Sequence, residues 1–356
     1  MSETIEAAPG TRIFGPDALF LVWGPPSHGP RSQVFARELG IEIRFIHSFR
    51  RRGALVAPFK YLSMGAKTVR LLAARRPRVV FVQSPPTIAV ATVWAFAVLT
   101  GARFFIDTHS AAMLSPYWTR PAWLHRLIAR RAAATIVTNQ YFAHRIRERG
   151  GTALVIPDIP TAFRIGEPFE VEGDFAVMVV NSFAPDEPLS EILAAARELP
   201  GVSFYVTGDP NRAGAAIPRP LPVNVRLTGF LPDPTYYALM ASCQAVMCLT
   251  TRDHTMQRGA CEALWMGTPI VTSRWPLLQE YFSSGTVHVG GSATQIRDGI
   301  QRMVREYDEY QLGIRRLGAE RRRGWWDAIA SLVSLVEAPA RDPATSALRR
   351  RARRSG

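Results

Sequence analysis

Residues 245–273 read AVMCLTTRDHTMQRGACEALWMGTPIVTS. The apolar run 245–249 has the length and composition of a buried β-strand, and it ends in polar residues. A short helical stretch follows, carries the carboxylate of Glu262 and stops at Gly267, and a second apolar run begins at Pro269. In a parallel α/β sheet, this order places polar side chains and a helix N-terminus at the carboxyl ends of strands, where ligands bind. The same residues also fit an ordinary βαβ unit with one helical glutamate near its surface.

Short apolar runs alternate with helical stretches along most of the chain. In the first half, this pattern predicts strands at 18–23, 41–46, 79–82, 103–106, 135–137 and 153–156, and helices at 31–39, 57–74, 88–99, 122–133 and 140–149. In the second half, it predicts strands at 175–180, 203–207, 225–227, 245–249, 270–272 and 286–289, and helices at 189–199, 234–242, 258–266, 277–282 and 294–307. Alternating β and α elements imply a parallel sheet that is covered on both faces. We therefore expect an α/β protein of two similar Rossmann-like domains.

The domain boundaries follow from composition. We expect an N-terminal domain at 11–157, a linker at 158–174 that is rich in Pro, Gly and acids, and a C-terminal domain at 175–310. An amphipathic helix at 311–337 follows, and the Pro-, Ala- and Arg-rich tail 338–356 is expected to be disordered.

Cysteine usage and apolar runs favour a cytoplasmic setting. Cys243, Cys248 and Cys261 are odd in number and lack metal-like spacing, so we expect reduced core residues. The N-terminus has no basic region before an apolar stretch, and we expect no signal peptide. The longest apolar run, 87–100, is too short to span a bilayer and is better explained as a buried helix.

The net charge of +14 is unevenly distributed. Residues 1–165 carry 22 Lys and Arg against 8 Asp and Glu, whereas residues 166–340 carry 15 against 20. Anionic membrane or a phosphate-bearing acceptor would suit the basic half. The helix 57–74, with Lys60, Tyr61, Lys67 and Arg70, could lie on anionic lipid or simply cover the sheet. Nucleic acid is not expected, because no helix-turn-helix, zinc finger or interleaved aromatic-basic pattern is found.

Three loops of the first half could carry chemistry, and one of them, Val82-Gln83-Ser84-Pro85-Pro86-Thr87, ends a strand of the same predicted sheet as the other two. The turn Trp23-Gly24-Pro25-Pro26-Ser27-His28-Gly29-Pro30-Arg31-Ser32 opens a helix whose N-terminus favours an anion, and Gly29 permits close backbone approach; the alternative is a stiff strand–helix turn. His109 lies at a strand's carboxyl end, where an imidazole can exchange a proton with a substrate hydroxyl or phosphate. Asp107 could orient His109 or cap a helix. A lone histidine is also often a structural hydrogen-bonding group.

The second half has three polar strand ends besides the opening stretch. They are Asn181-Ser182-Phe183, Thr207-Gly208-Asp209 and Thr228-Gly229-Phe230-Leu231. Their backbone donors could line a nucleotide crevice. Glu262 could accept hydrogen bonds from two vicinal hydroxyls, and Arg252, Arg258 or Arg212 could neutralise a diphosphate.

Together these residues resemble a known family. Two Rossmann-like domains, a strand-end His109, Gly229-Phe230-Leu231 and the stretch from Glu262 to Pro269 resemble the GT-B nucleotide-sugar glycosyltransferases of group 1, family 4-like. The runs Val82-Gln83-Ser84-Pro85-Pro86 and Phe105-Ile106-Asp107-Thr108-His109 are similar to the mannosyltransferases that extend dolichyl-diphosphate chitobiose.

The resemblance implies a nucleoside diphosphate-sugar bound in a central cleft that the two domains face. Glu262 would hold the ribose, Gly229-Phe230-Leu231 would lie near the base, and His109 would face the transferred sugar. The Asp253-His254-Thr255 loop would approach the sugar or the diphosphate, and Arg252 and Arg258 would supply positive charge. The sugar nucleotide is a co-substrate, and no other cofactor and no metal are expected, because helix N-termini and basic side chains carry the diphosphate charge.

Two departures from the family pattern concern the donor pocket. His254 stands where many relatives have the first of two glutamates eight positions apart. Many relatives also have an Arg and a Lys after the first strand of the second domain, but here that loop reads Phe183-Ala184-Pro185-Asp186-Glu187-Pro188. The diphosphate must then find its cations elsewhere, or the donor pocket is altered.

The leading hypothesis is an enzyme that transfers a hexose from a nucleoside diphosphate-sugar to a lipid-linked or polysaccharide acceptor in cell-envelope polysaccharide synthesis. It would work in the cytoplasm, peripherally on the inner face of the cytoplasmic membrane. A nucleotide-sugar epimerase of the same fold is an alternative, and it would need no acceptor groove. A non-catalytic module that binds nucleotide or an anionic polymer is another. The sugar, the nucleotide, the acceptor and the stereochemical course stay open.

Overall fold

The computed structural model describes residues 4–5, 14–26, 30–48, 56–115, 117–118, 120–212, 217 and 220–338. The chain forms two compact units, one made of residues 1–159 with 326–356 and the other of residues 160–325. The predicted linker 158–174 contains no helix or strand. Gly29 and residues 339–356 of the predicted disordered tail lie outside the described residues.

The first unit is built on one seven-stranded sheet of order β1-β3-β2-β4-β5-β6-β7, which is parallel except for the pair β1–β3. Its strands are β1 (Thr4–Ile5), β2 (Ala18–Trp23), β3 (Glu42–Ile46), β4 (Val79–Ser84), β5 (Arg103–Thr108), β6 (Ala134–Val137) and β7 (Ala153–Val155). Its helices are α1 (Pro30–Leu39), α2 (Ala57–Arg75), α3 (Thr87–Thr100), α4 (Ser110–Leu114), α5 (Ala122–Arg131) and α6 (Gln140–Glu148).

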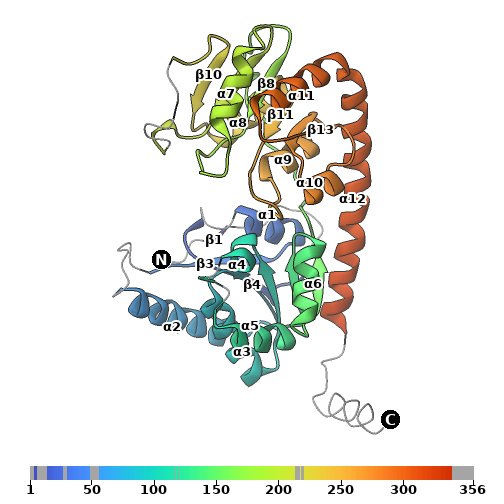
Figure 1. Ribbon diagram of the computed structural model, residues 1–356. Helices are drawn as coiled ribbons and strands as arrows, with labels where there is room; N and C mark the ends of the chain where they lie inside the picture. The colour runs from blue at the N-terminus through green and yellow to red at the C-terminus, as the bar shows by residue number, and fades with distance from the viewer. Residues whose placement is uncertain are drawn as a thin grey trace. The chain divides into compact units, whose positions relative to one another are not determined.

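The strands β2, β4 and β6 are buried on both faces, as their mostly apolar sequences require. Leu21, Val80 and Val82 pack under α2, α3 and α5 on one face. Residues that alternate with them point to the other face, where the rings of Phe81 and Phe105 stack with centroids 5.0 Å apart. Figure 1 shows α2, α3 and α5 together in the lower part of the view. The sheet is therefore the rigid base of any site at its edge.

The second unit has a six-stranded parallel sheet of order β10-β9-β8-β11-β12-β13. Its strands are β8 (Ala176–Val179), β9 (Ser203–Thr207), β10 (Val225–Gly229), β11 (Ala245–Cys248), β12 (Ile270–Ser273) and β13 (Thr286–Val289). Its helices are α7 (Leu189–Arg197), α8 (Asp233–Ser242), α9 (Arg258–Met266), α10 (Pro276–Tyr281) and α11 (Ala293–Arg305), with a 3₁₀ turn η2 (Pro210–Arg212). The core over one face contains the three predicted core cysteines, which are all buried and outside any disulfide.

The last helix, α12 (Tyr307–Glu337), differs from the prediction. It begins before residue 311, and the residues from Trp326 onward belong to the first unit, so the helix is not a separate part of the chain. The Arg103 guanidinium at the start of β5 donates to the carbonyls of Leu335 and Val336 at 3.0 and 2.8 Å. These carbonyls are at the helix C-terminus, where no intrahelical donor reaches them, and a cation satisfies them.

Some further details correct the expected elements. Strand β1 and helix α4 are absent from the predicted pattern because both are too short to show a period. Strands β4 and β5 continue to Ser84 and Thr108, so Asp107 is a strand residue. The apolar run 87–100 is α3, which buries only part of its surface. No described helix is both long enough and apolar enough to cross a bilayer.

Candidate active site

In the first unit, the site begins at the carboxyl ends of β4 and β5. The two strands pair in parallel with Gln83 opposite Asp107, and His109 follows β5 directly. The backbone N–H of His109 donates to the Ser84 carbonyl at 2.9 Å, which fixes the histidine against β4. Helix α1 brings Ser32 to the same edge. The register of two central strands therefore fixes the position of the predicted pair.

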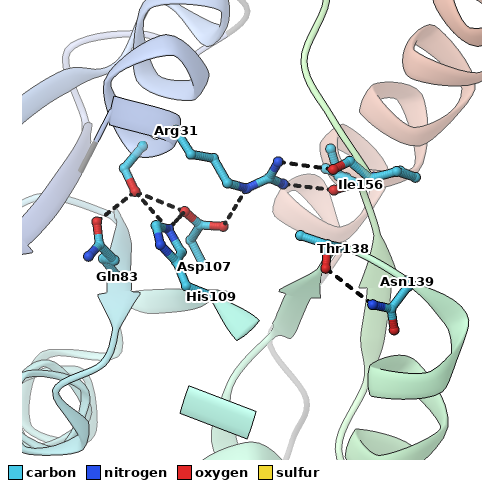
Figure 2. Close-up of polar contacts among 9 residues, drawn as sticks. Arg31, Gln83, Asp107, His109, Thr138, Asn139 and Ile156 are labelled. Carbon is cyan, nitrogen blue, oxygen red and sulfur yellow. Dashed lines mark hydrogen bonds and ion pairs between the residues drawn. The ribbon is translucent and has the colours of Figure 1, made fainter. Parts of the chain in front are cut away.

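Ser32, Gln83, Asp107 and His109 form one hydrogen-bonded cluster (Figure 2). The Ser32 Oγ lies 2.9 Å from both Gln83 Oε1 and Asp107 Oδ2, and 3.4 Å from His109 Nε2. The His109 Nε2 lies 3.3 Å from the same Asp107 oxygen. A carboxylate accepts only, so we assign the ring proton to Nε2, and Nδ1 is then the acceptor nitrogen.

Asp107 is fully buried, and its charge is held by its neighbours. Burial alone would raise the pKa of this carboxyl, but the hydrogen bond and charge of His109, the Arg31 guanidinium and the Ser32 hydroxyl together lower it. The Arg31 Nε lies 3.7 Å from Asp107 Oδ1, and its terminal nitrogens donate to the carbonyls of Ile156 and Pro157 at 2.7 and 3.3 Å. Figure 2 shows Arg31 between the carboxylate and the chain after β7.

The structure separates the two roles considered for Asp107. His109, and not Asp107, precedes the first turn of α4, and no side chain caps that helix. An anionic carboxylate that accepts from Nε2 orients the imidazole and cannot itself donate a proton. The sequence analysis named the loops that contain Arg31, Ser32 and Gln83 but did not select these three side chains as site residues. They could have been found from their position, because they lie in the turns that follow the first and third predicted strands.

In the second unit, the loop after β8 is held together by its own acids. The backbone N–H groups of Ser182 and Ala184 donate to Glu187 Oε2 at 2.8 and 3.0 Å, and the Ser182 hydroxyl donates to Oε1 at 2.9 Å. Asn181 Oδ1 accepts from the Phe183 N–H at 2.7 Å, and Phe183 has a positive φ of 58°. Converging N–H donors form an anion-binding nest. Here a carboxylate of the chain occupies it.

Asp186 joins this loop to the one that follows β11. Its Oδ2 accepts from the Thr250 hydroxyl at 2.9 Å, its carbonyl accepts from the Thr251 N–H at 2.8 Å, and its Oδ1 lies 3.3 Å from Arg252 Nη2. The predicted cation Arg252 is exposed but ion-paired. Next in the chain, His254 has a positive φ of 57°, and Asp253 Oδ1 accepts its N–H at 2.6 Å. Thr255 donates to the Asp253 carbonyl at 3.3 Å.

Glycine brings the loops after β8 and β9 into close contact. Gly208 has a φ of +101°, and a Cβ there would lie 2.1 Å from the Asn181 carbonyl oxygen. Its N–H donates to the Gly229 carbonyl at 3.1 Å. The adjacent Asp209 is engaged locally, because its Oδ1 accepts from the Asn211 backbone and side chain at 3.0 and 2.9 Å. Asn181, Gly208 and Gly229 are thus one contiguous edge of the sheet.

After β10, the predicted base-binding residues differ in exposure. Phe230 is 80% exposed, whereas Leu231 packs against the core between β8 and α8. An exposed phenyl ring on a strand-end loop offers a stacking surface to an aromatic base. Only Phe230 of this pair therefore has a face free for a ligand.

Glu262 lies in the second turn of α9 and is 8% exposed. Its Oε1 accepts from Arg258 Nε at 2.7 Å and its Oε2 from the Tyr236 hydroxyl at 3.0 Å, while the Tyr237 hydroxyl is 3.5 Å from Oε1. Burial and the Glu262 charge raise the pKa of Tyr237 to about 12 and raise the pKa of Tyr236 well above its usual value, so both hydroxyls remain donors. The structure thus pairs Arg258 with Glu262, a contact that the sequence analysis did not predict. The two tyrosines were missed, although they open the helix that follows Phe230.

Two family models match the chain. A glycosyl transferase 4-like domain matches residues 14–158, and a glycosyl transferase-like domain matches residues 187–325. A search of curated protein sequences found no match.

Solved structures resemble the chain over both units. A sucrose-phosphate synthase from Thermosynechococcus elongatus is 14% identical, with a TM-score of 0.66 over 89% of this chain and 97% of the other. The HepE protein from Anabaena in complex with UDP and glucose is 15% identical, with a TM-score of 0.64 over 89% and 99%. An α,α-trehalose-phosphate synthase (UDP-forming) from Burkholderia vietnamiensis is 13% identical, with a TM-score of 0.63 over 89% and 99%. These likenesses show the fold, and with the two family models they establish that the chain belongs to the group 1 glycosyltransferases of the GT-B fold.

Proposed function

We propose that this glycosyltransferase moves a sugar from a nucleoside diphosphate-sugar to a lipid-linked acceptor, with a polysaccharide acceptor as the other member of the expected class. The observation that carries the proposal is the Asp107–His109 pair at the carboxyl edge of the first sheet. With Nε2 fixed on a buried carboxylate, Nδ1 can accept a hydrogen bond from a substrate hydroxyl. Transfer joins an acceptor oxygen to the anomeric carbon while the bond from that carbon to the diphosphate breaks.

The second unit supports the donor part of the proposal. Phe230 offers a stacking surface for the base, and Glu262 with Arg258 offers a buried carboxylate and a cation at one helix start. Ribose hydroxyls would share Glu262 with Tyr236, which already donates to it. The related HepE structure contains UDP and glucose, and we extend that chemistry to this chain as part of the proposal.

We propose that transfer needs no metal ion. The first unit has an excess of basic side chains, and α9 presents its N-terminus and Arg258 in the second unit. These groups can balance phosphate charge. Activity that survives complete removal of divalent ions by EDTA supports this part, and activity restored only by added Mg²⁺ contradicts it.

The donor is tested first by thermal shift. UDP-, GDP-, ADP- and dTDP-sugars are screened with the full chain, because a ligand that binds only the folded state raises its unfolding temperature. We expect one nucleotide series to raise it and the Phe230→Ala variant to weaken that response. No response to any sugar nucleotide, with retained folding, would refute the donor assignment.

Catalysis is tested with the responding donor. Release of nucleoside diphosphate is followed with His109→Ala and with His144→Ala, whose imidazole is on the exposed face of α6 and pairs with Glu148 at 3.2 Å. We expect a loss of about 10²–10⁴-fold for His109→Ala and none for the control. Full turnover by His109→Ala removes the role proposed for this residue. An epimerised sugar formed from donor alone would instead favour the epimerase alternative.

A further inference from the structure

Helix α2 has two apolar faces, and the core of the first unit uses only one. Met64, Thr68 and Leu72 are the buried face. Phe59, Leu62 and Val69 lie on the other side and are 71%, 74% and 50% exposed. Their spacing of three and then seven residues keeps them on one stripe of the helix. A covering helix does not need this second stripe.

The stripe continues over the neighbouring helices. Leu99 at the end of α3 is 85% exposed, and it lines one open groove of about 1330 Å³ together with Val69. Trp123 in the first turn of α5 and Tyr117 before it are 65% and 70% exposed. Helices α2, α3 and α5 lie side by side over one face of the sheet (Figure 1). We call the set Phe59, Leu62, Val69, Leu99, Tyr117 and Trp123 the α2–α3–α5 face.

This face reaches the catalytic edge of its own sheet. Helices α2 and α3 begin after the carboxyl ends of β3 and β4, and α5 follows His109 and α4. Phe59 and Trp123 lie in the first turns of their helices and therefore near the edge that holds His109. A partner surface that binds the α2–α3–α5 face would therefore hold an acceptor close to His109.

The three helices of this face carry charge of one sign, although the exposed acids Asp17 and Glu337 also line the groove beside Val69 and Leu99. Between Glu42 and Glu148, the sequence contains seventeen Lys and Arg residues and a single carboxylate, Asp107, which is fully buried. Arg70 and Lys67 flank the stripe on α2, and Arg126 lies beside Trp123 on α5. No acidic side chain on α2, α3 or α5 can oppose an anionic surface.

We propose that the α2–α3–α5 face docks on a bilayer that contains anionic phospholipid; this deepens the lipid-linked acceptor of the proposed function. Tryptophan and tyrosine favour the bilayer interface, and the aliphatic residues reach the acyl region below it. The surrounding basic side chains pair with lipid phosphates. Nucleic acid is disfavoured because Leu62, Val69 and Leu99 offer it neither stacking nor hydrogen bonds. The same face of a second copy is disfavoured because it would bring like charges together.

The proposal is tested by co-sedimentation of the full chain with vesicles, without donor or acceptor. One set is phosphatidylcholine alone and the other contains about 30% phosphatidylglycerol. We expect binding to the anionic set only, weakened by salt at roughly 0.5 M. Phe59→Ser with Leu62→Ser should weaken binding by about tenfold or more, and Lys67→Gln with Arg70→Gln by a similar factor. The matched control, Val223→Ser with Leu312→Ser, removes exposed apolar side chains of the second unit and should change nothing.

Three outcomes would overturn the proposal. The first is equal binding to neutral and anionic vesicles, and the second is no binding to either set. The third is a dimer seen by light scattering without lipid that becomes a monomer in the Phe59→Ser, Leu62→Ser double variant. The His109→Ala variant should bind vesicles like the wild type. If the wild type binds anionic vesicles but no sugar nucleotide is turned over, the proposed function fails while the docking surface stands.

Discussion

Replacing Asp107 with asparagine should separate the orientation of His109 from the folding of the first unit. The substitution keeps the shape of the side chain. Ser32 Oγ faces the same Oδ2 position as His109, so with an amide nitrogen there Ser32 accepts from it and donates to Gln83 Oε1 instead. The substitution removes the charge that faces the Arg31 guanidinium at 3.7 Å. The asparagine NH₂ can turn toward His109 Nε2, now 3.3 Å from a carboxylate oxygen, and make that nitrogen an acceptor. The ring proton then moves to Nδ1, which could no longer accept from a substrate hydroxyl.

The expected loss of stability and turnover can be estimated from the interactions that Asp107→Asn removes. A hydrogen bond to a charged group contributes about 1.5–3 kcal/mol, and the removed charge no longer has to be buried, so we expect a net loss of about 2 kcal/mol. For a unit of this size, that lowers the unfolding temperature by roughly 4–8 °C. Turnover should fall by about 10²–10⁴-fold, as expected when a base has the wrong tautomer.

The pH dependence of folding stability provides a second, independent test of the role of Asp107. The folded-state pKa of Asp107 is lowered from an ordinary value of 3.8, so its ionised form stabilises the fold at every pH above that value. This contribution is lost as the pH falls through the folded-state pKa. The difference between wild type and Asp107→Asn should therefore be constant near neutral pH and shrink below about pH 4.

Differential scanning fluorimetry from pH 3 upward and donor turnover at neutral pH measure these effects. Asp17→Asn is the matched control, because Asp17 is an exposed carboxylate of the same unit. A variant that keeps full turnover, or one whose stability deficit persists unchanged in acid, would refute the reasoning.

Three further substitutions test the second unit. Gly208→Ala forces a Cβ to 2.1 Å from the Asn181 carbonyl at a φ of +101°, and should destabilise the unit by several kcal/mol in thermal unfolding; Gly201→Ala, with open space around its Cβ, should be tolerated. Tyr236→Phe leaves Glu262 with one donor fewer and should cost about 1–3 kcal/mol of unfolding free energy, whereas equal stability would mean that another group replaces the hydroxyl. Phe230→Ala should remove about 1–3 kcal/mol of stacking on the base, and should therefore raise the KM for the donor with little change in kcat. An unchanged KM would place the base elsewhere.

The periodic elements could be predicted from the sequence because buried parallel strands and their covering helices have strong patterns. Strands β2, β9 and β13 match their predicted ranges, and β4 and β5 were cut short where Gln83, Ser84, Asp107 and Thr108 turn polar. The polar ends of central strands belong to the strand by backbone pairing, which composition does not reveal. The course of α12 was also hidden, because the attachment of its last turns depends on Arg103, more than two hundred residues away.

The candidate site was predictable by position and less so by partners. Asp107 and His109 are two residues apart at a strand end, so their pairing could be predicted from local spacing. The Arg258–Glu262 pair was not predicted, although both residues lie four positions apart on one helix. Ser32 and Tyr236 could not be predicted, because they reach the site through packing of helices that are distant in sequence. The altered donor loop was noticed from its composition, but only the structure shows Glu187 filling its anion-binding nest.

Charge links the Asp107–His109 pair to the α2–α3–α5 face, for which we propose membrane docking. A protein that approaches an anionic bilayer gains from every exposed cation and loses from every exposed acid within about a Debye length. The role that we propose for His109 nevertheless requires one carboxylate to orient its ring. Both requirements are met because Asp107 is completely buried and paired with Arg31. The carboxylate charge is therefore neutralised and does not repel an anionic surface. It follows that an acid introduced at an exposed position near the edge, such as Ala122→Glu beside Trp123, should weaken vesicle binding while leaving the Asp107–His109 hydrogen bond intact.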